Sequence, residues 1–231
     1  MITDIAGFAL APAPFWPMDI GAGQPRVMER IDGTFSRYEI AWTADDRLAE
    51  VRTSLEPGRV RWRDVYVWNG ARIDRIRHFD EATDEAPDQP EHERVFTYDV
   101  GDRPAGTHML RKFSKQREPI ETWQWSDGGR TVHVIESAKG STLTEKTARF
   151  DAADRLSHVE KVRAFDGART TIDLEWSPDG RLLVAREHSG AELATERVVR
   201  FRWNDAGQLV SQSSPDDPSI ELWAYRYDEG A

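Results

Sequence analysis

The chain has 231 residues and a net charge of −10, with 41 acidic and 31 basic side chains. This balance argues against nucleic acid as the main partner, because phosphate contacts require a basic face. The absence of cysteine excludes disulfides and thiol chemistry. Contents of 39% hydrophobic and 31% charged residues predict a sheet with one solvated face, or a barrel with a solvated interior or exterior, rather than a thick sandwich core.

The first 30 residues lie outside any repeat and contain a proline-rich stretch, residues 11–17. Proline removes donors from a β-ladder, so we expect residues 1–30 to be an extended segment that packs on the sheet or plugs an opening. A flexible tail is the alternative, but it would leave Phe15 and Trp16 in solvent. No basic signal-peptide start and no apolar run of membrane-span length are present, so we expect a cytoplasmic protein with no membrane partner.

Residues 31–231 are organised by a motif that recurs eight times: an aromatic residue, a small oxygen-bearing residue, and a short polar loop. The aromatics recur every 24–30 residues and are Trp42, Trp68, Tyr98, Trp125, Phe150, Trp176, Trp203 and Tyr227. This period accommodates two strands and two turns, whereas a four-stranded propeller blade needs about 40–45 residues. The sequence therefore predicts a single repeat domain, 31–231, built from eight β-hairpins.

The loops after these aromatics have the residue types of a tight turn. Within residues 176–182, Ser177 can accept a backbone hydrogen bond, and Gly180 can adopt the left-handed conformation that the fourth turn position favours. Apolar residues alternate before each turn, as at Ile172 and Leu174, which is typical of a half-buried strand. The predicted fold is all-β: an antiparallel meander of about sixteen short strands from eight hairpin repeats, forming a β-spiral-like curved sheet or barrel.

The eight repeat aromatics have two interpretations. They could form a ladder on which sugars or bases stack, or they could occupy one shared core position. Recurrence at a fixed point of the hairpin favours the core position, so we predict that they form the structural repeat core.

The longest interval between repeats contains an acidic stretch, residues 80–93. It has no Lys or Arg and carries seven carboxylates: Asp80, Glu81, Asp84, Glu85, Asp88, Glu91 and Glu93. The stretch is predicted to be an inserted loop with two interpretations: a solvated insertion that only aids solubility, as most charge runs are, or an electrostatic arm whose carboxylates bind a basic protein. A basic run follows at Arg111, Lys112, Lys115 and Arg117 and could pair with this loop.

No sequence motif indicates catalysis. The chain has no phosphate-binding glycine loop, nucleophile elbow or zinc-protease histidine pair. His133 and His158 both lie eight residues after a repeat aromatic and could approach one another, but a metal site would need a third ligand. We therefore predict no catalytic residues, no metal and no cofactor.

The turn motif resembles the YD repeat of Rhs-type polymorphic toxins and teneurins. The shared pattern is an aromatic residue, Asp, Asn or Ser, two variable residues, Gly or Asp, Arg and Leu; residues 150–156 and 203–209 match it best. The resemblance runs from about residue 38 to the end of the chain. In that family the hairpins wind into a β-spiral shell around a toxin or cavity. This chain has Trp instead of Tyr at five sites and too few repeats for an enclosing shell, so the resemblance implies the hairpin architecture and an association with bacterial toxin systems.

Three functions follow in order of preference. The first is a non-enzymatic protein-binding module, most concretely an immunity-like or antitoxin-like inhibitor of a basic toxin. The second is a carrier that holds an apolar small molecule against an aromatic-lined curved sheet or barrel. The third is a hydrolase that uses carboxylates and histidines.

Overall fold

The computed structural model of the chain describes residues 25–31, 36–45, 47–80, 89–112, 118–190, 193–213, 217 and 219–227. These ranges contain sixteen strands and one 3₁₀ turn, η1 (Asp127–Gly129). The strands are β1 (Val27–Arg30), β2 (Arg37–Trp42), β3 (Leu48–Glu56), β4 (Arg59–Asn69), β5 (Arg72–Asp80), β6 (His92–Tyr98), β7 (Pro104–Arg111), β8 (Glu118–Ser126), β9 (Thr131–Ala138), β10 (Ser141–Phe150), β11 (Leu156–Arg163), β12 (Arg169–Trp176), β13 (Leu182–Ser189), β14 (Thr195–Trp203), β15 (Leu209–Ser213) and β16 (Glu221–Arg226).

The hydrogen-bonded strand order starts β1-β16-β15 and continues through the strands in descending number to β2. Each even-numbered strand ends at or within one residue of a repeat aromatic. The prediction of an all-β antiparallel meander of about sixteen strands from hairpin repeats is therefore confirmed. Residues 1–24 of the predicted N-terminal segment lie outside the described residues.

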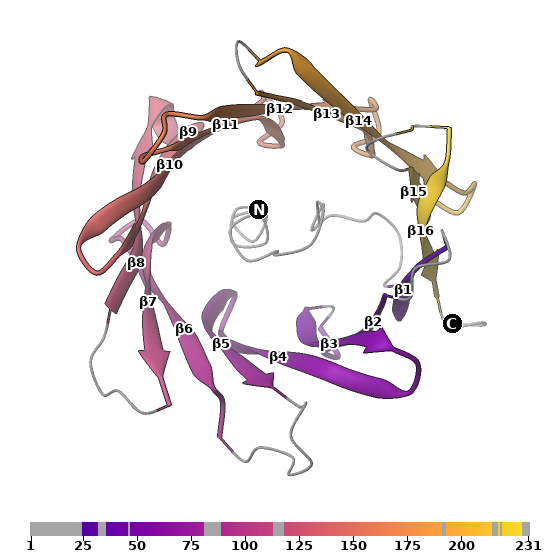
Figure 1. Cartoon of the computed structure of the whole chain (residues 1–231), viewed down its shortest axis with the longest axis horizontal. Coiled ribbons are helices and arrows are strands. Elements are labelled where there is room, and N and C mark those ends of the chain that lie inside the picture. Colours follow the sequence, from indigo (N-terminus) through magenta and orange to yellow (C-terminus); the bar gives the residue numbers. More distant parts are fainter. Residues whose placement is uncertain are drawn as a thin grey trace. The chain divides into compact units, whose positions relative to one another are not determined.

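The chain forms two compact units. The β8–β13 unit comprises the described residues within 96–108 and 118–200. The β1–β5 unit comprises the described residues within 25–95, 109–112 and 201–227, and it also contains β15 and β16. Strands β6, β7 and β14 contribute residues to both units. In the β8–β13 unit, successive strands pair antiparallel and lie side by side (Figure 1).

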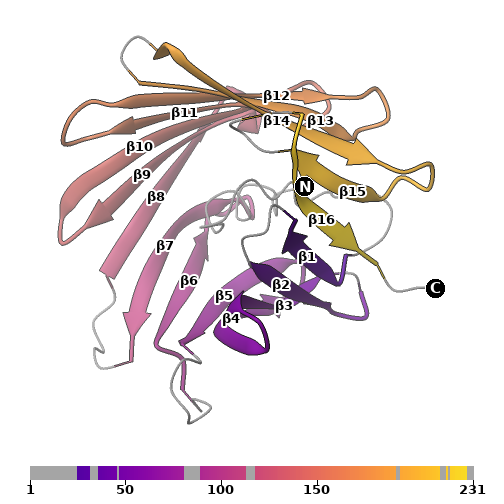
Figure 2. The same cartoon turned by 45° about the vertical axis from the view of Figure 1, so that its right-hand side comes forward.

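Within the β1–β5 unit, β1 lies between β16 and β2 (Figure 2). Met28 is opposite Tyr225 of β16 on one side and Tyr38 of β2 on the other. The eighth repeat ends at Tyr227 with no described strand after it. Strand β1 therefore pairs with β16 of this repeat on one side and with β2 on the other, so both edges of β1 are paired.

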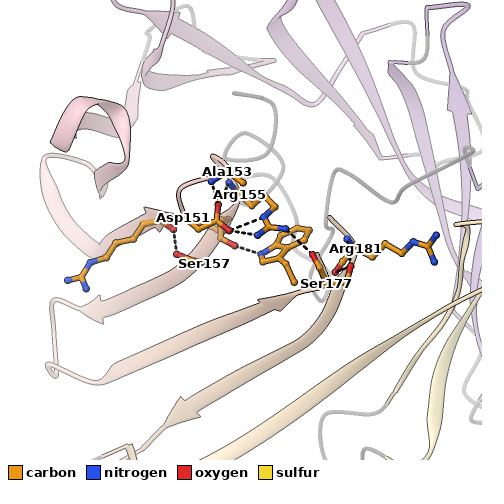
Figure 3. A network of polar contacts seen from close by, with 9 residues as sticks. Asp151, Ala153, Arg155, Ser157, Ser177 and Arg181 are labelled. Atoms are coloured by element: carbon orange, nitrogen blue, oxygen red, sulfur yellow. Dashed lines mark hydrogen bonds and ion pairs between the residues drawn. The ribbon is translucent and has the colours of Figure 1, made fainter. Parts of the chain in front are cut away.

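The turn of the fifth repeat shows why the motif needs an oxygen-bearing side chain after the aromatic (Figure 3). Asp151 Oδ1 accepts hydrogen bonds from the backbone N–H groups of Ala153 and Arg155 at 2.8 and 3.0 Å. The fourth turn residue, Asp154, has φ of 58°, which Asp tolerates better than most residues. Asp99, Ser177 and Asn204 accept the corresponding backbone hydrogen bond in their own turns, so the turn chemistry is common to the repeats.

In the fifth and third repeats, the Arg of the motif contacts the aromatic of the following repeat. Arg155 donates to Asp151 Oδ2 at 2.8 Å, donates to the Ser177 carbonyl at 3.1 Å, and places its guanidinium carbon 5.7 Å from the ring centroid of Trp176 (Figure 3). Arg103 lies in the same way over Trp125, at 6.0 Å. A planar guanidinium can bind a carboxylate and stack on an indole at once, which explains the recurrence of Arg at this position.

The repeat aromatics are half-buried rather than fully buried. Trp176 Nε1 donates to the Leu156 carbonyl at 2.7 Å, Trp68 Nε1 to the Leu48 carbonyl at 2.8 Å, and Tyr227 Oη to the Leu209 carbonyl at 2.9 Å. Each acceptor is the first residue of the second strand in the preceding repeat. The aromatics thus connect consecutive repeats through side chain to backbone hydrogen bonds.

The most buried side chains lie on either side of these aromatics. They include Ile40, Ile73, Phe96, Trp123, Val132, Val159, Leu182, Phe201 and Leu209, all at most 6% exposed. A bulge falls at the aromatic: pairing passes from Arg149 opposite His158 to Phe150 opposite Leu156. One extra residue resets the alternation of side chains, which is why Leu156 and Val159, three positions apart, are both buried.

Candidate functional site

The candidate site lies in the β1–β5 unit, where the acidic stretch 80–93 leaves β5 and enters β6. Asp80 is the last residue of β5, and Glu91 immediately precedes β6, where its side chain is exposed. Their strands pair directly, with His78 opposite His92. The predicted binding residues Glu81, Asp84, Glu85 and Asp88 lie outside the described residues.

Two of the predicted acidic residues form ion pairs within the sheet. Glu93 lies 3.1 Å from an Arg75 nitrogen and 2.9 Å from an Arg77 nitrogen, and Asp80 lies 3.7 Å from Arg61. The charge of Glu93 is therefore largely balanced by its own sheet.

The basic run of the sequence also approaches the site. The Lys112 backbone N–H donates to the Glu91 carbonyl at 2.9 Å, so the end of β7 lies beside the start of β6. This contact is through the backbone. Lys115 and Arg117 lie outside the described residues.

Two histidines lie at the base of the acidic stretch. Their rings stack with centroids 4.6 Å apart and an interplanar angle of 22°. Nδ1 of His78 lies 2.7 Å from Asp64 Oδ1 on β4, and both of these side chains are about a quarter exposed. Cross-strand pairing places all three side chains on one face, because Asp64 is opposite His78 and His78 is opposite His92.

The two imidazoles have opposite electrostatic environments. The hydrogen bond that His78 donates to Asp64 raises the pKa of His78 and, together with the charges of Asp64, Asp80 and Glu91, outweighs the lowering effect of burial. Burial lowers the pKa of His92, and the neighbouring His78 lowers it further. The pKa of His78 therefore lies above the usual histidine value near 6.5, and the pKa of His92 lies below it. At a pH between these two pKa values, His78 is protonated and His92 is neutral.

Other groups complete the surroundings of the histidine pair. Arg94 and Arg111 also lower the pKa of His92. Loss of hydration raises the pKa of Tyr66 on β4, and the adjacent Asp64 adds to that effect. The face therefore combines a carboxylate, two imidazoles and a neutral phenol, which is an arrangement whose charge changes near neutral pH.

His133 and His158 do not form a joint site. Nε2 of His133 lies 3.5 Å from Glu145, whereas Nδ1 of His158 lies 2.7 Å from Asp173. Their strands, β9 and β11, are separated by β10. Among the described residues, no group of three or more His, Asp or Glu side chains is arranged to hold a metal ion.

A second polar feature of the β1–β5 unit lies on β15 and β16. Gln212 and Trp223 are directly opposite one another and are 1% and 3% exposed. Tyr225 Oη donates to Gln212 Oε1 at 3.1 Å. Gln212 Nε2 and Trp223 Nε1 are buried without a hydrogen-bond partner in the part of the chain that the structure describes.

Sequence reasoning identified the acidic stretch but missed the histidine pair. A signal was present: His78 precedes Asp80 by two residues, and His92 follows Glu91, so the two histidines flank the stretch. To recognise them as neighbours, one must know the register of β5 against β6. The sequence alone does not define this register, because the ends of the two strands around the acidic stretch are not marked. The contribution of Asp64 depends in addition on the register of β4.

No protein-family model matches the chain, and no curated protein matches it. Similar solved structures include the Photorhabdus luminescens Tc holotoxin pore, at 9% identity over 82% of this chain and 14% of that chain, with a TM-score of 0.36. The TcdB2-TccC3-Cdc42 crystal structure matches at 12% identity over 84% of this chain and 14% of that chain, with a TM-score of 0.34. A porin-like protein from Bacteroides uniformis matches at 8% identity over 90% of this chain and 100% of that chain, with a TM-score of 0.41.

This chain thus spans only a small part of the toxin-complex chains that it matches. All three likenesses are too weak to indicate a function. Across the described ranges, no helix has the length and hydropathy of a transmembrane span.

Proposed function

We propose that the chain is a non-enzymatic protein-binding module that recognises a basic protein through its acidic stretch, residues 80–93. The observation that supports this most is the position of the stretch. It starts and ends on paired strands, with Asp80 and Glu91 at the two ends, and the four carboxylates between them have no basic neighbour in sequence. A concentrated negative charge on a rigid base attracts a cationic surface and accelerates association.

The partner that we propose is a basic toxin, and the role is that of an immunity-like inhibitor. Support comes from the repeated turn, in which the aromatic, the Asp and the Arg of the YD-like motif each have a structural contact. We also propose that the repeated turn is related to the YD repeat.

A matched pair of charge variants tests the proposed surface. The first neutralises the acidic stretch with Glu81→Gln, Asp84→Asn, Glu85→Gln and Asp88→Asn. The second removes the same charge from exposed positions elsewhere, with Glu56→Gln, Glu145→Gln, Glu196→Gln and Asp205→Asn. Both variants have the same net charge, so any difference between them reports the location of the charge.

The full-length protein and both variants would be used to capture partners from the native cell lysate at low and high salt, and the affinity of each purified partner would then be measured. We expect the first variant to lose affinity for a basic protein by roughly tenfold or more and the second by much less. Equal losses in the two variants would contradict the proposed surface, and so would binding that salt does not weaken.

A carrier function is the second candidate, because Gln212 Nε2 and Trp223 Nε1 are buried donors with no hydrogen-bond partner among the described residues. An unpaired buried donor costs about 1–3 kcal/mol, and a bound molecule with carbonyl or carboxylate oxygens would recover that cost. Mass spectrometry of an organic extract of the purified protein tests this function. A stoichiometric ligand that is lost in Gln212→Leu would support it, whereas an extract without such a ligand would count against it.

A further inference from the structure

We infer that the stacked His78–His92 pair makes partner binding at the acidic stretch pH-dependent, with tight binding at neutral pH and release under mildly acidic conditions. This inference rests on the proposed function and adds its regulation. The pair has no direct part in the proposed contact. It lies at the base of the stretch, on the two strands that hold both of its ends.

The geometry favours a pair with one proton. Asp64 binds one imidazole at 2.7 Å and supports a positive charge there. The second ring stacks on the first at a centroid distance of 4.6 Å, so a second positive charge would lie against the first. Two like charges at this distance repel strongly in a partly buried site.

Charged groups from each neighbouring strand act on the pair. Asp64 faces it from β4, and Asp80 lies two residues after His78 on β5. Glu91 and Arg94 belong to the β6 side, and Arg111 acts on His92 from the end of β7. The two arginines oppose a proton on His92, whereas the carboxylates support one on His78.

The direction of the effect follows from these charges. Above the raised pKa of His78, both rings are neutral and the base of the stretch is most negative. Between the two pKa values, one positive charge is held beside Asp64. Below the lowered pKa of His92, a second positive charge appears on His92, the residue that follows Glu91 in the sequence. This charge reduces the negative potential at the end of the stretch and repels both His78 and a basic partner.

The test uses the full chain and a fluorescent peptide of sixteen lysines as the cationic probe. Peptide affinity is measured at fixed ionic strength from pH 7.5 to pH 5 for the unmodified protein, His92→Gln and His158→Gln. His158 is the control: like His78 it binds a carboxylate at 2.7 Å, but it lies in the other unit. In parallel, NMR resonances of the imidazole Cε1–H groups report the titration of each histidine directly.

We expect the peptide affinity of the unmodified protein to fall by roughly three- to tenfold across the titration of His92. His92→Gln should lose most of this pH dependence, and His158→Gln should retain it. NMR should show the two rings of the pair titrating on opposite sides of the usual histidine value.

The outcomes separate the regulation from the proposed function. Peptide binding with the same pH dependence in His92→Gln and the unmodified protein would overturn the inference and leave the binding function standing. A single shared titration of His78 and His92 would also overturn it, whatever the affinity. Absence of peptide binding at every pH would overturn the proposed function and, with it, the regulation.

Discussion

The turn at Asp151 and the base of the acidic stretch both place a carboxylate against a nitrogen-bearing side chain, but the partners differ in kind. Asp151 is bound by two backbone N–H groups and by the guanidinium of Arg155. Asp64 is bound by an imidazole that itself stacks on another imidazole. A guanidinium stays charged at all accessible pH values, whereas an imidazole changes charge near neutrality.

This difference separates a structural contact from a site that can respond to conditions. The pKa of Asp151 is lowered, since its hydrogen bonds from Arg155 and Ala153 outweigh its slight burial. Its contacts therefore persist from mildly acidic to alkaline pH. The contact between Asp64 and His78 is an ion pair only when the imidazole is protonated, so its strength depends on pH.

The largest effect is expected from breaking the repeat contacts at Trp176. Trp176→Ala removes the indole that Arg155 covers and the hydrogen bond to the Leu156 carbonyl. We expect the free energy of unfolding to fall by about 3 kcal/mol, at the low end of the range for a large aromatic because the ring is half-buried. Urea unfolding followed by circular dichroism measures this change.

Trp176→Phe is the control for this prediction, because it keeps a ring under Arg155 and removes the indole N–H. We expect a loss of about 1 kcal/mol, the net contribution of one hydrogen bond. Equal stabilities of the Phe variant and the unmodified protein would show that the link to Leu156 contributes nothing.

The next effect is expected at the turn carboxylate. Asp151→Ala leaves two backbone N–H groups and Arg155 without this acceptor, and we expect a loss of about 1.5 kcal/mol. Asp151→Asn keeps an oxygen for the backbone and loses only the charge, so its cost should be about 0.5 kcal/mol. Chemical denaturation of the two variants side by side distinguishes these contributions, and identical losses would mean that the ion pair, not the turn, stabilises this loop.

The sequence predicted the turn better than it predicted the site, and the reason is the range of the contacts. Asp151 contacts residues two and four positions away, so the spacing of the motif contains the interaction. Asp64 and His78 are fourteen residues apart, and their meeting depends on how two strands are aligned. The register shift between Val67 and Trp68 alters that alignment, and no local pattern in the sequence indicates this shift.

The role of the repeat aromatics was predicted in position but not in detail. Their spacing located the hairpins correctly, because the turn always follows them. Their half-burial was not predictable from alternation, because the bulge at residues such as Phe150 moves the deepest packing to Leu156 and Val159. The indole and phenol donors also need acceptors, which holds these rings at the edge of the buried layer.

A smaller effect is expected from pH, and it acts on the site rather than on the turn. His78 has a raised pKa, so its stabilising contact with Asp64 is complete below the unfolded-state value and is lost as pH rises through the folded-state pKa. His92 has a lowered pKa, so its neutral state stabilises the fold above the unfolded-state value, and this stabilisation is lost as pH falls through the lowered pKa. Stability should therefore peak between the two values.

Asp64→Asn tests this assignment. It should flatten the alkaline side of the stability profile by about 0.5–1 kcal/mol, as is usual for a partly exposed ion pair. The measurement is the melting temperature from pH 5 to pH 8, with Asp173→Asn, the partner of His158, as the control. If both variants changed the profile alike, the stacked pair would have no special role.

A further small effect on stability is expected at the fourth position of the turn, where the repeats differ among themselves. Asp154 adopts φ of 58°, and the corresponding Gly180 and Gly207 adopt 87° and 77°. A non-glycine residue in this region is strained, although Asp tolerates it better than most. Asp154→Gly should therefore raise the free energy of unfolding by about 0.5 kcal/mol, and Gly180→Ala should lower it by about 1 kcal/mol. Because nothing lies within 4 Å of a Cβ added at Gly180, a loss there would arise from backbone conformation alone, and opposite signs in the two variants would establish that the turn conformation itself contributes to the stability of the repeat.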